Sequence, residues 1–135
     1  MIEPPENIEL LKFPNHLFWF DENGILCGKS ISGKQVDLPV MKELSEKIIA
    51  HLEGKKVCML IDFSNVSKAD RETRDFVNRE FPKIAKAVAL LSQNPLGRMM
   101  ANLFFNLKKQ PYPTKMFDKE EEAKQWLLDF TDEED

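Results

Sequence analysis

The stretch at 56–63, KVCMLIDF, decides the fold class. Its apolar side chains follow one another without polar alternation, which is typical of a strand buried on both faces of a sheet. A second run of this kind, AVALL at 87–91, follows a polar stretch that contains Pro82. Ser67 and Asp70 have the S-x-x-D spacing of a capping box, which predicts a helix that must stop before the proline. Strand, helix and strand in this order indicate parallel pairing through a right-handed crossover.

The same alternation continues on both sides of this unit. Upstream, Asp37 or a neighbour caps a helix that has Pro39 in its first turn and ends at Gly54. Downstream, Pro95 begins a third helix, and TKMF at 114–117 is a short last strand before a final helix. The apolar positions at helical spacing in the first and last helices are Met41, Leu44, Ile48 and Leu52, and Ala123, Trp126, Leu127 and Phe130.

The N-terminal part predicts antiparallel strands. HLFWF at 16–20 and ILCGKSI at 25–31 flank DENG, whose Asn-Gly pair is a strong hairpin signal because both residues tolerate a positive φ. IELLKF at 8–13 is a candidate edge strand. EPPEN at 3–7 is expected to be a loose lead-in, since adjacent prolines block helix and ladder alike. The prediction is an α/β fold with a mixed, mostly parallel sheet, an N-terminal antiparallel hairpin and about four helices.

Composition and charge predict a soluble globular chain with one domain, 1–130. Of its 135 residues 42% are hydrophobic, and the longest apolar runs, of five or six residues, are too short to span a membrane. The start at 1–10 lacks the cationic and apolar regions of a secretion signal, and Cys27 and Cys58 lack CxxC spacing. We therefore expect a reduced, cytoplasmic protein. The net charge of −4 equals that of the last four residues, so 131–135 is expected to be an acidic, disordered tail.

Two stretches resemble a known family. VCMLIDFSNVSKADRE at 57–72 resembles the central strand, loop and helix of the STAS domain, the fold of the bacterial anti-sigma factor antagonist SpoIIAA. AVALLSQNPLGRMMANLFFNLKKQPYPTKMFDKEEEAKQWL at 87–127 is similar to a group of uncharacterised bacterial SpoIIAA-like proteins. The resemblance implies a small sheet with helices beside it and a regulatory or binding role without catalysis. In the phosphorylated antagonists a serine follows the aspartate that matches Asp70; here Arg71 stands there, so the phosphorylation switch is not implied.

Polar residues gather where the first buried strand ends. Asp62 closes the apolar run, and Ser64, Asn65 and Ser67 follow in the same loop. Because α/β proteins place ligand-binding groups at the carboxyl ends of parallel strands, these four residues predict a polar crevice. Alternatively, Asp62 and Ser64 fix the loop by accepting hydrogen bonds from backbone N–H groups.

The sequence predicts no metal, no cofactor and no enzymatic activity. His16 and His51 lack the HxxH or HExxH spacing of zinc sites, and we expect them at the surface or at a helix end. Cys58 lies in an apolar strand, and Cys27 has only Lys29 as a basic neighbour, so both are expected to be structural thiols.

The stretch at 94–117 holds ten large apolar side chains, four cations and no acid. On a helical wheel, one apolar stripe is expected to face the core: Leu96, Met99, Met100, Leu103, Phe104 and Leu107. A row of small residues that ends in Phe105 runs beside it. With the neighbouring cations, this row forms a candidate interaction surface of Gly97, Arg98, Ala101, Phe105, Lys108 and Lys109. Either the domain covers the row, or the row is a contact surface, which we favour, with a second copy of the chain as partner. Its few cations do not indicate nucleic acid.

Three functions are compatible with these patterns. The leading hypothesis is a non-enzymatic regulatory or protein-interaction module. The second is a carrier of a lipid or other apolar ligand, because helices rich in Met and Phe near a sheet edge can open a pocket. The third and weakest is an enzyme that uses Asp62 and the serines after it.

Overall fold

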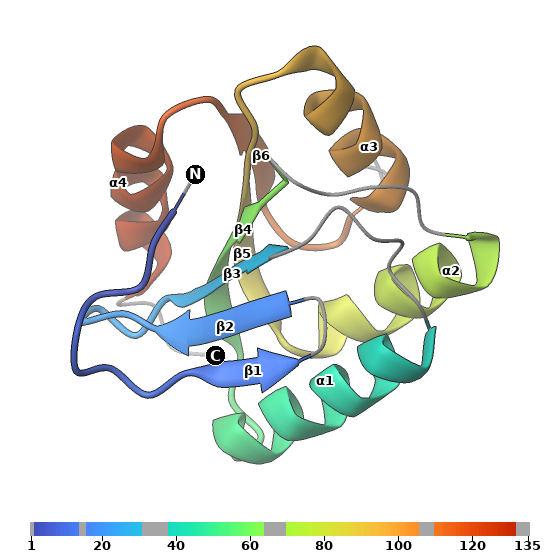
Figure 1. The fold of residues 1–135 in the computed structure, drawn as a ribbon, viewed down its shortest axis with the longest axis horizontal. Helices are drawn as coiled ribbons and strands as arrows, with labels where there is room; N and C mark the ends of the chain where they lie inside the picture. The colour runs from blue at the N-terminus through green and yellow to red at the C-terminus, as the bar shows by residue number, and fades with distance from the viewer. Residues whose placement is uncertain (1, 14–15, 31–37, 64–69, 106–109, 132–135) are drawn as a thin grey trace.

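The computed structural model describes residues 2–13, 16–30, 38–63, 70–105 and 110–131 (Figure 1). Strands and helices alternate along most of this chain. The strands are β1 (Leu11–Phe13), β2 (His16–Phe20), β3 (Leu26–Ser30), β4 (Val57–Asp62), β5 (Ala85–Leu91) and β6 (Thr114–Phe117). The helices are α1 (Leu38–Leu52), α2 (Arg71–Glu80), the 3-10 turn η1 (Phe81–Lys83), α3 (Pro95–Phe105) and α4 (Glu120–Thr131).

All six strands form one mixed sheet, in the order β1-β2-β3-β4-β5-β6. β1, β2 and β3 pair antiparallel, and β3, β4, β5 and β6 pair parallel. The predicted α/β fold, with an N-terminal hairpin beside a mostly parallel sheet, is confirmed. Because each right-handed crossover adds the next strand on the same side, the connecting helices all lie on one face of the sheet.

The two faces of the sheet are covered differently (Figure 1). α1, α2 and α3 lie on one face, whereas α4 packs on the other against β4, β5 and β6. Successive residues of β4 point to opposite faces, so Met59 lies in the core beneath α1–α3 and Leu60 in the core beneath α4. The continuous apolar run therefore belongs to a strand covered on both sides, as its sequence predicts.

The hairpin between β2 and β3 forms at the predicted place. Gly24 adopts a φ of +78°, a conformation that side chains other than glycine rarely adopt. The Asp21 carboxylate holds the turn, since its Oδ1 accepts hydrogen bonds from the backbone N–H groups of Asn23 (2.8 Å) and Ile25 (2.9 Å). β1 pairs with β2 at the edge of the sheet, as predicted for the 8–13 stretch, although only three of its residues form the strand.

The start of the chain contradicts the expected loose lead-in. The Ile2 side chain is only 1% exposed and belongs to the core beneath α4, where Ile8 and Leu10 pack against the same cluster. Figure 1 shows the first residues running beside α4. Pro4 and Pro5 do keep the segment out of helix and strand. The apolar residues on both sides of the prolines nevertheless bury enough surface to dock it.

The helix ends follow local sequence signals, with one correction. Gly54, with a φ of +84°, follows α1 as predicted, whereas the candidate cap Asp37 lies outside the described residues. α2 begins at Arg71 rather than near Ser67, because Asp70 is itself the N-cap and its carboxylate accepts the Thr73 N–H at 2.8 Å. Ser67 also falls outside the described part of the chain.

The end of the chain differs slightly from the prediction. Thr131 still belongs to α4, so a tail would begin no earlier than 132, and 132–135 are not among the described residues. Of the helices that the structure describes, none has both the length and the apolar character needed to cross a membrane.

Candidate functional site

Asp62, the last residue of β4, is a buried carboxylate at the carboxyl end of the parallel strands. It is 1% exposed, and its Oδ2 accepts a hydrogen bond from the backbone N–H of Ile2 at 2.8 Å. Sequence reasoning offered a ligand crevice or a loop fixed by backbone N–H groups as its role. The observed N–H group belongs to Ile2, at the start of the chain and 60 residues away. The other predicted crevice residues, Ser64, Asn65 and Ser67, lie outside the described residues.

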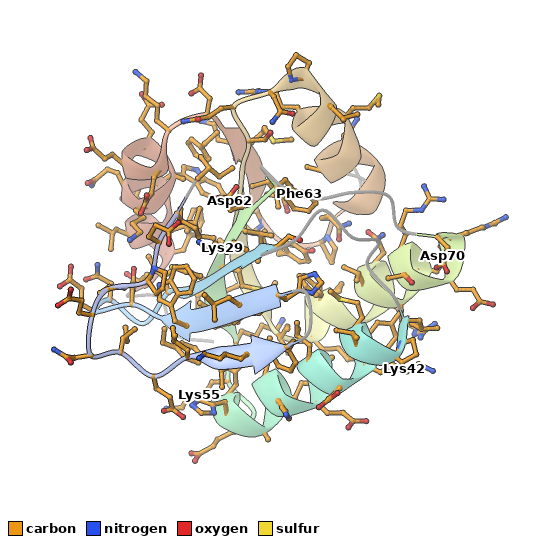
Figure 2. The ribbon with its side chains drawn as sticks, in the orientation of Figure 1. Lys29, Lys42, Lys55, Asp62, Phe63 and Asp70 are labelled. Atoms are coloured by element: carbon orange, nitrogen blue, oxygen red, sulfur yellow. The ribbon has the colours of Figure 1, made fainter. Side chains whose placement is uncertain are left out.

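Lys29 and Asp62 lie side by side on the neighbouring strands β3 and β4. The two residues are register partners between β3 and β4, and Figure 2 shows both beside the start of the chain. The Lys29 side chain is 9% exposed, and its Nζ lies 2.8 Å from Oε1 of Glu3, whose own side chain is 71% exposed. Two buried charged groups of opposite sign therefore hold two consecutive residues of the N-terminal segment.

Sequence reasoning assigned no role to Lys29 or Glu3. One signal was present, because Lys29 is the only charged residue in the strand ILCGKSI, where a buried cation needs an acidic partner. Nothing in the local sequence identified that partner. Glu3 is 26 residues away, in a stretch whose prolines suggested a loose chain.

The start of α3 packs closely against the end of β4. Asn94 Oδ1 caps the helix by accepting the Gly97 N–H at 2.6 Å. A Cβ atom at Gly97 would collide with Oγ of the buried Ser92 and would lie 3.0 Å from the carbonyl oxygen of Phe63. Glycine at this position therefore sets the distance between the helix and the sheet.

The face of α3 that contacts the domain differs from the predicted one. Gly97 and Ala101 are buried, whereas Leu96 is 60% and Met99 is 52% exposed. The expectation that Leu96 and Met99 face the core is wrong, and so is the expectation that Gly97 and Ala101 form an open surface. The physical reason is that small side chains allow the closest approach of two backbones, and here the sheet rather than a partner makes that approach.

Several residues of the predicted interaction surface are not tested by these contacts. Arg98 is exposed on α3, as that surface requires. Phe105 ends the helix, but its side chain is outside the described part of the structure, as are the side chains of Met100, Leu103 and Phe104. Lys108 and Lys109 lie in the undescribed stretch at 106–109.

The cysteines behave as structural thiols. Both Cys27 and Cys58 are buried, and neither forms a disulfide. Burial raises the pKa of Cys27 to about 12, and the nearby Asp21 carboxylate acts in the same direction. Cys58 Sγ lies 3.9 Å from the Leu127 carbonyl oxygen in the core beneath α4. The Cys27 thiol is therefore not set up to form a thiolate nucleophile.

The two histidines are placed differently from each other. His51 is exposed near the end of α1 and stacks on Phe20 with ring centroids 5.5 Å apart, which fits the predicted surface position. His16 is buried in β2 against Phe18, so its predicted surface position is wrong. Within the described ranges, no three His, Cys, Asp or Glu side chains are grouped as a metal site would require.

A shallow hollow lies between the N-terminal segment and α1. Ile8, Glu9, Leu11, Phe20 and His51 line it, and its volume is about 230 Å³. Sites for small organic ligands have volumes of about 300–1,000 Å³. The volume of the hollow is therefore below the range of sites that bind small organic ligands, and a lipid tail would need a larger site.

Arg71 occupies the first position of α2. Its guanidinium is exposed, and its Nε lies 3.8 Å from Asp75 Oδ2, one turn along the helix. Exposed pairs of this kind contribute little to stability.

Known proteins support this fold and family. The chain belongs to the family described as Domain of unknown function (DUF7793), whose profile matches residues 18–131. It is also similar to the crystal structure of an uncharacterized protein from the DUF3478 family of Shewanella loihica PV-4, which has a SpoIIAA-like fold. That likeness has a TM-score of 0.55 and 19% sequence identity, and covers 89% of this chain and 91% of that chain. The predicted SpoIIAA-like architecture is thus confirmed.

Two further comparisons add no functional information. A protein of unknown function from Arthrobacter sp. FB24 is 25% identical over 82% of this chain and 97% of that chain, with a TM-score of 0.32. No curated protein matches the chain.

Proposed function

We propose that this member of the DUF7793 family is a regulatory protein-interaction module that acts by binding rather than by catalysis. The position of its exposed apolar side chains supports the proposal. Among the described residues, the large apolar side chains that are well exposed are Ile49, Leu96 and Met99. A single exposed leucine needs no explanation, but Leu96 and Met99 lie one turn apart on α3. An apolar pair ringed by polar groups is typical of a protein contact site.

Polar residues surround this pair. Arg98 and Asn102 are exposed on α3, and Gln93 and Asn94 are exposed just before it. In this proposal Leu96 and Met99 are the anchors and Arg98 belongs to the charged rim, while the buried glycine and alanine support the helix from beneath. Lys108 and Lys109 would extend the rim. A second copy of the chain is the partner that we propose to test first.

The chemistry of the buried groups is compatible with binding alone. The Cys27 thiol stays protonated, and Asp62 is buried and accepts the backbone N–H of Ile2. The first residue of α2 is Arg71, so we also propose that no phosphate at that position controls association.

The test compares two charge substitutions at exposed apolar sites. Leu96→Asp combined with Met99→Asp places acid on the proposed contact face, and Ile49→Asp is the matched control on α1. All three side chains are exposed, so both variants are expected to keep the wild-type melting temperature. Sedimentation and affinity capture should show association weakened by at least about tenfold in the α3 variant alone, because interface anchors contribute about 2 kcal/mol or more. Equal association of wild type and both variants would contradict the proposal.

The alternative, a carrier of an apolar ligand, has less support. The hollow beside His51 is small, and none of its lining residues belongs to α3. Mass spectrometry of an organic extract of the purified protein tests this alternative directly, since a carrier would retain a stoichiometric lipid.

A further inference from the structure

We propose that the carboxyl ends of β3 and β4 form a peptide-binding site that the protein's own N-terminal segment, residues 2–10, occupies in cis. The preferred ligand is an extended chain with an apolar residue followed by an acidic one, as in Ile2-Glu3. This site is separate from the α3 face and does not depend on the function proposed for it.

The contacts of the N-terminal segment are those by which proteins recognise bound peptides. The Ile2 N–H donates to Asp62, which fixes the backbone of the segment. The Ile2 side chain is buried among apolar residues that include Trp19, which provides an apolar pocket. The Glu3 carboxylate meets the Lys29 ammonium, so the next side chain is recognised by charge. A main-chain hydrogen bond combined with recognition of particular side chains is a general mode of extended-peptide recognition.

The segment can be exchanged without breaking the sheet. All of residues 2–10 are described, and they lie outside every helix and strand, with β1 beginning at Leu11. Pro4 and Pro5 have no backbone N–H to contribute to a ladder. The segment is therefore held mainly by its side chains and by the Ile2 amide, and a second peptide that offers the same groups could compete for them.

The buried charges indicate selection of a ligand. Removing Asp62 and Lys29 from water costs free energy, and apolar residues at both positions would hold a hydrophobic chain end without that cost. A carboxylate that accepts an N–H and an ammonium that donates to an acidic side chain instead discriminate among ligands. Glu3 of the segment contacts the Lys29 ammonium, so a peptide with an acidic residue at this position fits the site. The ends of parallel strands are also the usual place for ligand sites in α/β proteins.

Occupation in cis determines how well a free peptide binds. The apparent dissociation constant equals the intrinsic one divided by the fraction of molecules in which the site is open. Substitutions that weaken binding of the segment to the site, while Asp62 and Lys29 stay intact, should therefore increase the affinity for an added peptide.

The experiment uses the full chain and a fluorescein-labelled peptide with the sequence of residues 1–10, MIEPPENIEL. Fluorescence anisotropy is measured with wild-type protein and with an Ile2→Ser, Glu3→Lys double variant. The double variant is expected to bind the peptide at least about tenfold more tightly, because its own segment is the poorer competitor. The peptide should also raise the melting temperature of the variant more than that of the wild type. A control peptide carrying the same two substitutions should not bind.

Selectivity is tested on the same variant. Adding Lys29→Met should abolish the preference for the wild-type peptide over one with glutamine in place of Glu3. The proposal is overturned if the folded double variant binds no more tightly than wild type, or if it binds the control peptide equally well. Should the double variant fail to fold, Glu3→Lys alone provides the comparison, because that side chain is mostly exposed. An unchanged affinity in this single variant would overturn the proposal as well.

Discussion

Gly97→Ala tests how closely α3 packs on the sheet. The substitution should stabilise the protein if Gly97 faces solvent and destabilise it if Gly97 faces the sheet. At an exposed helical position, replacing glycine by alanine stabilises a protein by about 0.5–1 kcal/mol, since alanine loses less backbone entropy on folding. In this structure the added methyl group collides with Ser92 Oγ and approaches the Phe63 carbonyl. Overpacking of this kind costs about 1–3 kcal/mol. We therefore expect a net loss of about 1 kcal/mol in the free energy of unfolding.

Urea denaturation monitored by circular dichroism provides the assay, with the midpoint compared at an unchanged m-value. Met99→Ala is the matched exposed control and should change stability by less than about 0.5 kcal/mol. Ser92→Ala removes the oxygen that the new methyl group would strike. In the double variant, Gly97→Ala should therefore cost less than it does alone, and the cycle measures that coupling. If Gly97→Ala stabilises the protein, the assigned face of α3 is refuted.

Four further outcomes are expected. Ile2→Ala should lower the free energy of unfolding by about 2 kcal/mol or more, as for a buried isoleucine, and an unchanged urea midpoint would mean that the segment does not dock. Cys27 should resist thiol reagents at pH 8 unless the protein unfolds. Because its folded pKa of about 12 is raised, stability should also fall as the pH rises above about 8.5, where the unfolded thiol ionises, and Cys27→Ala should reduce this dependence. Deleting 132–135 should leave the melting temperature nearly unchanged but lower solubility, since the remaining chain has no net charge, and a fall of many degrees would show that the tail docks. Phosphoproteomics should find no stoichiometric phosphate on Ser64 or Ser67 that alters partner affinity.

Local patterns were sufficient to predict most of the fold. The apolar run that ends at Asp62 required a strand covered on both faces, and the Asn-Gly pair required a tight turn between antiparallel strands. Both signals lie within a few residues of the structure that they determine. Helical spacing in α1 and α4 likewise identified the side chains that pack on the sheet, since each helix has one apolar face.

The features that were missed depend on contacts between distant parts of the chain. Glu3 and Lys29 are far apart in sequence, so neither could be assigned a role before the N-terminal segment was placed on the sheet. On α3 the apolar residues extend around much of the helix, and spacing alone could not determine which side the sheet would cover. Because Gly97 has no side chain, its side of α3 can approach the sheet more closely than the other sides. That side therefore faces the sheet, and Leu96 and Met99 face outward.

Site-specific photocross-linking on α3 tests the proposed interaction most directly. A photoreactive amino acid is placed at Met99 in the full chain, and at Ile49 as a control that is also exposed, and both proteins are irradiated in cells of the source organism. A binding module with its contact face on α3 should give one discrete cross-linked product from position 99, with a second copy of the chain as the first candidate for the linked protein, and none from position 49. No discrete product at position 99, or the same products at both positions, would contradict the proposed function.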